Sequence, residues 1–338
     1  MNERDLILLS HGGGGRLMHE LIRDLFRARL RNPLLEQGDD SAVMKLGGAR
    51  VAFTTDSFVV DPLFFPGGDI GRLAVCGTIN DLAAMGAEPV AISASFIIEE
   101  GLPRATLERV VDSMQATAQE AGVQVVTGDT KVVTRGAADQ LFITTSGLGL
   151  VPAGIEISGS GARPGDVVLI SGPVGDHGIA VMSTRQGLAL ETEVVSDCAP
   201  LHGLVAAILA SVPAAVHAMR DPTRGGLAAS LNEIAEQSQV CIEIEEQAVP
   251  VRLGVRTACE LLGLDPLYSA NEGKMLVIAA PDHVPVVLEA MSAHPLGAES
   301  ARIGVVLPAP PARVHLRTAL GTRRILDLPS GEQLPRIC

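Results

Sequence analysis

A polar pair interrupts the apolar stretch GRLAVCGTINDLAAMG at residues 71–86. The apolar side chains recur at helical spacing around Asn80 and Asp81, so the pattern predicts a helix. Residues 51–55 before it read as a strand that ends at Asp56. A helix is expected over 104–121, and strands over 124–127 and 140–150, the first opening into Gly128 and Asp129. The first half of the chain is therefore predicted to be an α/β domain.

Glycine and proline break the pattern between about 150 and 162, where we place a domain boundary. Beyond it we expect strands at 166–171, 240–245 and 275–279, and helices at 175–187, 200–218, 225–238 and 284–293. Strands and helices do not alternate in regular βαβ units, which favours two α/β or α+β layers over a Rossmann sheet or a (β/α)₈ barrel. We predict domains at 1–155 and 156–320, followed by a mobile tail at 321–338.

Composition excludes several classes of protein. The formal net charge of −13 argues against binding a nucleic-acid backbone. Five cysteines without a C-x-x-C pair indicate neither a disulfide framework nor a zinc site. The charged N-terminus does not resemble a signal peptide, and residues 204–219 are too short and too broken to span a membrane. A cytoplasmic protein is expected.

Carboxylates recur where apolar segments end or turn, mostly beside Gly, Ser, Thr or Asn. They are Asp39, Asp40, Asp56, Asp81, Asp129 and Asp221. Any one of them is more simply a turn residue. Should they converge, their mutual repulsion would call for cations, and hard oxygen ligands select Mg²⁺, often shared with nucleotide phosphates.

Three other segments carry candidate chemistry. The run His11-Gly12-Gly13-Gly14-Gly15-Arg16 could approach a phosphate through backbone N–H groups or could be a hinge. Lys131, beside Asp129, could contact a transferring phosphate or move a proton, and Glu272 could be a general base if burial raises its pKa. For both residues, a salt-bridged loop position is the simpler alternative.

The last residue is Cys338, after Pro335-Arg336-Ile337. Its thiol could carry a chemical group or be an accidental exposed cysteine. An extended tail from residue 322 could span about 50 Å at ~3.3 Å per residue, enough to move between a buried and an exposed position. Arg336 is expected to lower the thiol pKa modestly. The other cysteines look like buried small hydrophobic residues.

Together these segments resemble the hydrogenase-maturation carbamoyl dehydratases of the HypE family over essentially the whole chain. The matching segments are 11–16, 38–41, 65–71, 77–82, 128–131, 220–226, 270–274 and, most specifically, Pro335-Arg336-Ile337-Cys338. The resemblance implies the two-domain fold of aminoimidazole ribonucleotide synthetase, with an N-terminal α/β domain whose sheet forms a homodimer, a C-terminal α+β domain and a flexible tail.

The resemblance also implies an activity. The carbamoyltransferase HypF loads Cys338, ATP drives dehydration of the S-carbamoyl group to a thiocyanate, and the cyanide passes to iron in the HypC–HypD complex. Catalysis is assigned to Cys338, Lys131 and Glu272. Magnesium ligands are Asp40 (or Asp39), Asp56, Asp81, Asp129 and Asp221. ATP contacts are Gly12, Gly13, Gly14, Asp40, Asp56, Asn80, Asp81, Gly128, Asp129, Asp221 and Asn271.

Two alternatives remain open at the level of sequence. A selenophosphate synthetase or small-molecule kinase of the same superfamily would share the fold, but the former usually carries a reactive Cys in its glycine loop, which residues 11–16 lack. A non-catalytic carrier that only presents Cys338 would not need Lys131 and Glu272.

Overall fold

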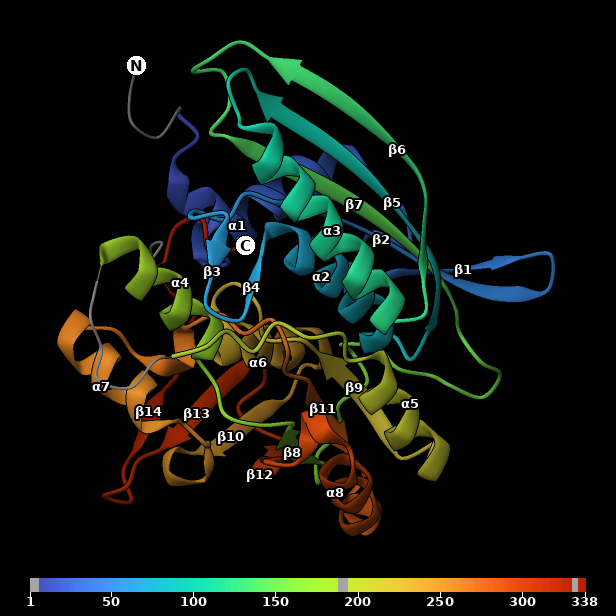
Figure 1. The fold of residues 1–338 in the computed structure, drawn as a ribbon. Helices are drawn as coiled ribbons and strands as arrows, with labels where there is room; N and C mark the ends of the chain where they lie inside the picture. The colour runs from blue at the N-terminus through green and yellow to red at the C-terminus, as the bar shows by residue number, and fades with distance from the viewer. Residues whose placement is uncertain (1–5, 188–193, 330–333) are drawn as a thin grey trace.

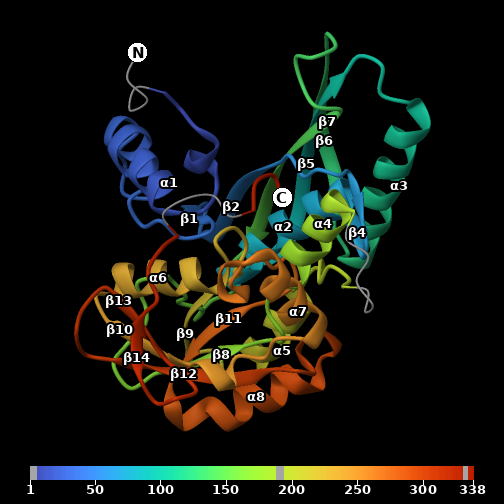
Figure 2. The same cartoon turned by 90° about the vertical axis from the view of Figure 1, so that its left-hand side faces the viewer.

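The computed structural model describes residues 6–187, 194–329 and 334–338, which form two sheet-based domains with the C-terminus between them (Figures 1 and 2). The N-terminal sheet has the strand order β1-β2-β7-β5-β6. Its strands are β1 (Ala42–Leu46), β2 (Ala49–Phe58), β5 (Glu88–Glu99), β6 (Gln124–Val133) and β7 (Leu141–Leu150). All neighbours pair antiparallel except β5 and β6, which are parallel.

Helices α2 (Ile70–Ala84) and α3 (Arg104–Glu120) cover one face of this sheet (Figure 1). Asp69 caps α2, since its Oδ1 accepts hydrogen bonds from the N–H groups of Gly71 (2.7 Å) and Arg72 (3.2 Å). Nearly every residue of α2 is buried. This helix therefore places Asn80 and Asp81 at the junction of the domains.

The C-terminal sheet has the order β14-β13-β10-β12-β8-β11-β9. Its strands are β8 (Val167–Ile170), β9 (Val216–Arg220), β10 (Cys241–Glu245), β11 (Leu276–Ala279), β12 (Ala301–Leu307), β13 (Arg313–Arg317) and β14 (Arg323–Ile325). Val168 and Ile170 face α6 (Gly226–Ser238), whereas Val167 and Leu169 face α5 (His202–Ser211) and α8 (Val284–Ala293). Alternation along one strand thus serves both cores.

The other α-helices are α1 (Arg16–Leu21), which continues as a π-helix (Ile22–Arg27), α4 (Asp176–Gln186) and α7 (Leu253–Leu262). A short ribbon is formed by β3 (Phe64–Phe65) and β4 (Gly68–Asp69). The domain class expected from sequence is therefore present.

Several boundaries predicted from sequence were wrong. The helix expected over 200–218 ends at Ser211, because Pro213 cannot continue it, and the chain then forms β9. The strand expected at 124–127 runs on through Asp129 and Lys131 to Val133. Helix α7 and strands β1, β5 and β12 to β14 lay outside the predicted elements, and β14 occupies the start of the segment predicted as a tail.

Candidate active site

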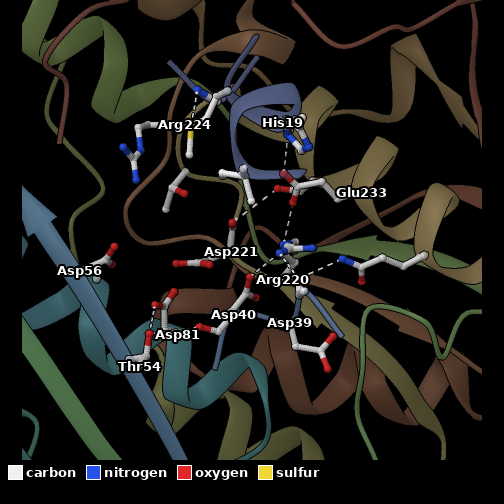
Figure 3. A pocket seen from close by; sticks show the side chains of 18 of the residues that line it. His19, Asp39, Asp40, Thr54, Asp56, Asp81, Arg220, Asp221, Arg224 and Glu233 are labelled. Carbon is white, nitrogen blue, oxygen red and sulfur yellow. Dashed lines mark hydrogen bonds and ion pairs between the residues drawn. The ribbon is translucent and has the colours of Figure 1, made fainter. Parts of the chain in front are cut away.

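A cavity of about 830 Å³ lies at the junction of the domains. It is lined by β2, α2, α6, the loops at 38–40 and 220–224, and the helical segment after the glycine run (Figure 3). Both Glu272 and the terminal Cys338 reach its wall. Residues from both ends of the chain thus meet in one enclosure.

Three aspartates converge in this cavity. One carboxylate oxygen each from Asp40, Asp81 and Asp221 lies within 4.8 Å of the others, and Figure 3 shows the three side chains pointing toward one another. Thr54 Oγ1 donates to Asp81 Oδ2 at 2.7 Å. Arg220 Nη2 contacts Asp40 Oδ1 at 2.9 Å.

Burial and mutual repulsion raise the pKa of each aspartate in the cluster. The pKa of Asp40 rises to about 6 through burial, which the Arg220 charge opposes. The pKa values of Asp81 and Asp221 rise well above the ordinary range, first through burial and then through neighbouring aspartates. Asp221 Oδ2 is buried with no hydrogen-bond partner. Clustered carboxylate oxygens that repel one another, one of them without a hydrogen-bond donor, fit a divalent cation with oxygen ligands.

Asp56 and Asp39 differ in their relation to the cluster. Asp56 on β2 lines the cavity, and burial raises its pKa against the opposing charge of Arg224. Asp39 is turned away (Figure 3) and accepts hydrogen bonds from the Gly159 N–H (2.8 Å) and Ser158 Oγ (3.1 Å). Asp39 and Asp40 are adjacent in sequence, and of the two it is Asp40 that joins the cluster.

An ionic chain that sequence reasoning missed holds the cluster in place. Arg220 bridges Asp40 to Glu233 on α6, with an Nε–Oε2 distance of 2.9 Å. His19 Nε2 on α1 lies 3.1 Å from the other oxygen of Glu233. The residues of this ionic chain are too far apart in sequence for a local pattern to connect them. The one sequence signal for Glu233 was an acidic residue on the inner face of the helix predicted at 225–238.

Glu272 is 2% exposed, and its Oε1 has no hydrogen-bond partner. Burial is the main reason that its pKa lies well above the ordinary value, followed by repulsion from Asp221 and Asp197. The sequence pointed to Glu272 as a general base on the condition that burial raises its pKa. The structure meets that condition.

Cys338 lies inside the cavity rather than at the surface. Its main-chain oxygen accepts a hydrogen bond from the Val59 N–H at 3.0 Å. Burial raises the thiol pKa to about 12, and Arg224 opposes this shift. The expectation that Arg336 lowers this pKa is wrong, because the Arg336 guanidinium turns back to the Val59 carbonyl (2.9 Å) and to Asp139.

The glycine run is only partly in the cavity. Gly14 lines it and has a φ of +72°, and a Cβ there would meet the Arg224 carbonyl at 2.6 Å. Gly12 and Gly13 lie outside it, and Gly13 borders a small neighbouring cavity. Close approach to Arg224 thus explains glycine at position 14.

Asn80 and Asn271 support the walls rather than facing the cavity. Asn80 accepts from the Leu201 N–H (2.8 Å) and donates to the carbonyls of Ala199 and Glu272. Asn271 accepts from the Gly175 N–H (2.7 Å) and donates to the Pro222 carbonyl (2.9 Å). Both side chains are fully buried. Their ATP contacts stay a prediction.

Asp129 and Lys131 lie on β6, away from the cavity. Strand register places Asp129 level with Ser95, Thr144 and Ser57, on the sheet face opposite Asp56. Their side chains are 62% and 67% exposed and pair with each other at 2.7 Å. Gly128 packs against the Ala94 carbonyl, where a Cβ would lie at 2.0 Å. Within one chain these three residues do not reach the cluster, and their predicted roles stay predictions.

The fold and the acidic inter-domain cavity define a class of protein. Residues 38–151 match the N-terminal domain, and 163–317 the C-terminal domain, of the AIR synthase related proteins. The chain is 55% identical over 330 residues to carbamoyl dehydratase HypE of Rhizobium leguminosarum bv. viciae, covering 98% of this chain and 94% of that protein.

Two solved structures extend this likeness. A HypE–HypF complex matches with a TM-score of 0.87 and 47% identity, covering 91% of this chain and 99% of that one. HypE in complex with ATP matches with a TM-score of 0.83 and 50% identity, covering 98% and 100%. The chain belongs to the HypE family of carbamoyl dehydratases. In the part of the chain that the structure describes, no helix is long and apolar enough to cross a membrane.

Proposed function

We propose that the chain dehydrates an S-carbamoyl group on its own Cys338 to a thiocyanate at the expense of ATP, supplying cyanide ligands for the iron centre of [NiFe]-hydrogenase. The observation that carries this proposal is the meeting of Cys338, Glu272 and the Asp40–Asp81–Asp221 cluster in one cavity. A thiol that only needed to be displayed would have no reason to lie there.

The reaction takes place in two steps. The carbamoyl oxygen attacks the γ-phosphorus of ATP, ADP leaves, and the nitrogen gives up one proton. The carbon–oxygen bond then breaks with loss of phosphate and the second nitrogen proton, leaving S–C≡N. The products are thiocyanate, ADP and phosphate. Phosphorylation turns a poor leaving group into a good one, and exclusion of water protects the intermediate from hydrolysis.

Asp40, Asp81 and Asp221 would hold Mg²⁺, with Asp56 nearby on β2. Bound Mg²⁺ would neutralise phosphate charge during transfer. The fit rests on the unpartnered Asp221 oxygen and on the raised pKa values of the cluster, since a cation relieves both. Arg220 already neutralises Asp40 in part and fixes its direction.

Glu272 accepts the first nitrogen proton in this scheme, and the second leaves with the departing phosphate. Its raised pKa makes its conjugate acid stable in the cavity, and hence makes the carboxylate a stronger base than an exposed one. Its Oε1 has no competing partner. The role predicted for Lys131 would require another chain to bring this residue near the cavity.

The uncovered face of the N-terminal sheet supports a homodimer. It exposes apolar side chains on adjacent strands, among them Phe53 (43%), Ile97 (41%) and Leu148 (39%). A second copy covering this face would also cover Asp129 and Lys131.

We infer two partners from the family to which the chain belongs. A carbamoyltransferase of the HypF kind would load Cys338, for which the tail must leave the cavity, and a HypC–HypD complex would accept the cyanide. The cytoplasm is the compartment we infer for these exchanges.

The proposal is tested by measuring ATP cleavage with carbamoylated and unmodified chain. We expect ADP to form in proportion to carbamoylated Cys338, and Cys338→Ser to abolish that dependence while retaining ATP binding. ATP cleavage that is equally fast without a loaded tail would argue for a kinase or a plain ATPase instead.

A further inference from the structure

The segment at 196–201 precedes α5 in the C-terminal domain, but its main chain is bound to the N-terminal domain. Arg72 Nε on α2 donates to the Cys198 carbonyl at 2.9 Å. Further along the same helix, Asn80 Oδ1 accepts a hydrogen bond from the Leu201 N–H at 2.8 Å. The position of this segment is therefore set by α2, the helix that reaches the acidic cluster.

Asp197 lies within this segment, and its side chain contacts the C-terminal domain. Its Oδ1 accepts a hydrogen bond from the Glu272 N–H at 3.0 Å. Lys274 Nζ lies 3.1 Å from Oδ2 but off the hydrogen-bond direction, so the two side chains, 3% and 10% exposed, form a buried ion pair. Gly273 has no room for a side chain, because a Cβ would lie 1.7 Å from the Asp197 carbonyl oxygen. The two segments thus meet in the closest contact that a main chain allows.

The Glu272 carboxylate depends on its main chain for its direction. Among the described residues, none forms a hydrogen bond with the buried Glu272 Oε1. The main chain at this position is instead bound on both sides. Asp197 holds the N–H, while Asn80 Nδ2 (3.2 Å) and the Ala199 N–H (3.3 Å) hold the carbonyl oxygen. Each of these partners lies on α2 or on the segment that α2 holds.

We propose that Asp197 is a positioning residue for the reaction: its hydrogen bond to the Glu272 main chain fixes the carboxylate relative to α2. The same helix carries Asp81 of the acidic cluster, so base and cluster keep one spacing across the domain junction. A reacting group misplaced by about 1 Å can cost on the order of 100-fold in rate. Lys274 offsets the buried charge of Asp197. The inference rests on the proposed function, since it takes Glu272 as the base.

Two double variants separate the hydrogen bond from the ion pair. Both are followed through one turnover of carbamoylated full-length chain at several ATP concentrations. The amide variant, Asp197→Asn with Lys274→Gln, is uncharged but keeps an acceptor for the Glu272 N–H. Its dehydration rate at saturating ATP should stay within about fivefold of native, the loss reflecting the repulsion that Asp197 exerts on Glu272.

The apolar variant, Asp197→Leu with Lys274→Met, replaces the buried pair by side chains of similar shape and leaves no acceptor. Its rate at saturating ATP should fall about 10- to 100-fold, while the half-saturating ATP concentration stays within about twofold of native. Asp166→Leu with His217→Leu is the matched control, since it removes another buried pair of the same domain, with a contact of 2.8 Å. The control should dehydrate at the native rate.

A positioning residue acts only through the group that it positions. In a Glu272→Gln chain, the apolar double substitution should therefore cause no further loss of rate, whereas a general loosening of the fold would slow both chains alike. If the apolar variant does not fold, Asp197→Ser with Lys274→Gln takes its place with the same expectations, because serine is too short to reach the Glu272 N–H.

Amide hydrogen exchange measures the same contact without ATP or a carbamoyl group. The peptide at 270–275 should exchange faster in the apolar variant than in native chain, and at the native rate in the amide variant. Peptides from α6 and from the N-terminal sheet should exchange as in native chain in both variants. Faster exchange confined to residues 270–275 would show that Asp197 holds this main chain.

A native dehydration rate in the apolar variant would overturn the inference. So would an equal loss in both double variants, a loss that persists in the Glu272→Gln chain, or a matching rise in the half-saturating ATP concentration. Native chain that forms no thiocyanate would instead contradict the proposed function. The exchange comparison would then still decide whether Asp197 holds Glu272, so the two failures are distinguishable.

Discussion

Asp81 and Asp129 both stand beside a small polar residue in or at the end of an apolar segment, yet they reach opposite environments. Asp81 lies on α2 between the domains, in a cluster whose oxygens repel one another. Asp129 lies on the open face of β6, where Lys131 and the Thr130 N–H lower its pKa. Asp81 accepts a hydrogen bond from Thr54 and is repelled by neighbouring aspartates, whereas Asp129 pairs with the Lys131 ammonium at 2.7 Å. Local sequence therefore does not determine whether a carboxylate needs a cation. The face of the sheet or helix on which the folded chain places the carboxylate does.

The largest effect should come from removing a carboxylate of the cluster. Asp221→Asn should slow ATP-dependent dehydration by about 1000-fold or more. The change removes one ligand of the magnesium ion that would neutralise phosphate charge during transfer. In magnesium-free buffer the same change should raise the unfolding midpoint, because ionising a buried group with a raised pKa costs stability at neutral pH.

The stability of the chain should depend on pH through Asp221. For Asp221 that cost is absent below the ordinary aspartate range and present above it, so native chain should gain stability as pH falls from 7 toward 5, and Asp221→Asn should gain less. A lower midpoint for the variant without magnesium would contradict the repulsion argued here.

The next largest effect should come from changing Glu272, which lines the same cavity but is proposed to act as a base rather than as a metal ligand. Glu272→Gln keeps the shape of the side chain and removes the base, so dehydration should slow by about 100-fold or more. ATP binding should persist, and mass spectrometry should find carbamoylated Cys338 accumulating. Normal thiocyanate formation would remove Glu272 from the mechanism.

A smaller effect concerns the cavity as an environment for the thiol. Docking raises the Cys338 pKa to about 12, so docking is unaffected below the ordinary thiol pKa of about 8.5 and weakens as pH rises above it. The alkylation rate of native chain should keep climbing tenfold per pH unit above 8.5. In Arg336→Ala, with the tail released, it should level off there. A plateau near 8.5 in native chain would place the thiol in solvent.

The smallest effect is expected on β6. Asp129→Asn breaks an exposed ion pair, which contributes about 0–1 kcal/mol, so the unfolding midpoint should hardly change. The upward shift of the midpoint on adding Mg²⁺ should also be retained. Loss of that shift would show that Asp129 reaches the cluster of another chain.

The sequence predicted the fold class and most of the long elements, because hydrophobic periodicity and turn chemistry are local signals. It singled out Asp40, Asp81 and Asp221 together with Asp129, but it could not show that the first three converge and that Asp129 lies apart. It could not separate Asp40 from Asp39, which point in different directions from adjacent positions. Nor could it find the Arg220–Glu233–His19 chain, whose members meet only after both domains have folded.

The terminal cysteine also shows what local sequence patterns cannot predict. Position alone suggested a free tail, but docking depends on donors at Val59, His177 and Arg185, none of which is near Cys338 in sequence. The ending Arg-Ile-Cys carried the functional signal, whereas the place where it rests required the folded groove.

The most direct test follows the C-terminal peptide by mass spectrometry after incubation with carbamoyl phosphate, the carbamoyltransferase and ATP. The account predicts that Cys338 first gains a carbamoyl group and then, only with ATP and Mg²⁺, loses the mass of one water. ATP hydrolysis with a carbamoylated peptide that never loses water would contradict the claim that this cavity dehydrates the chain's own end.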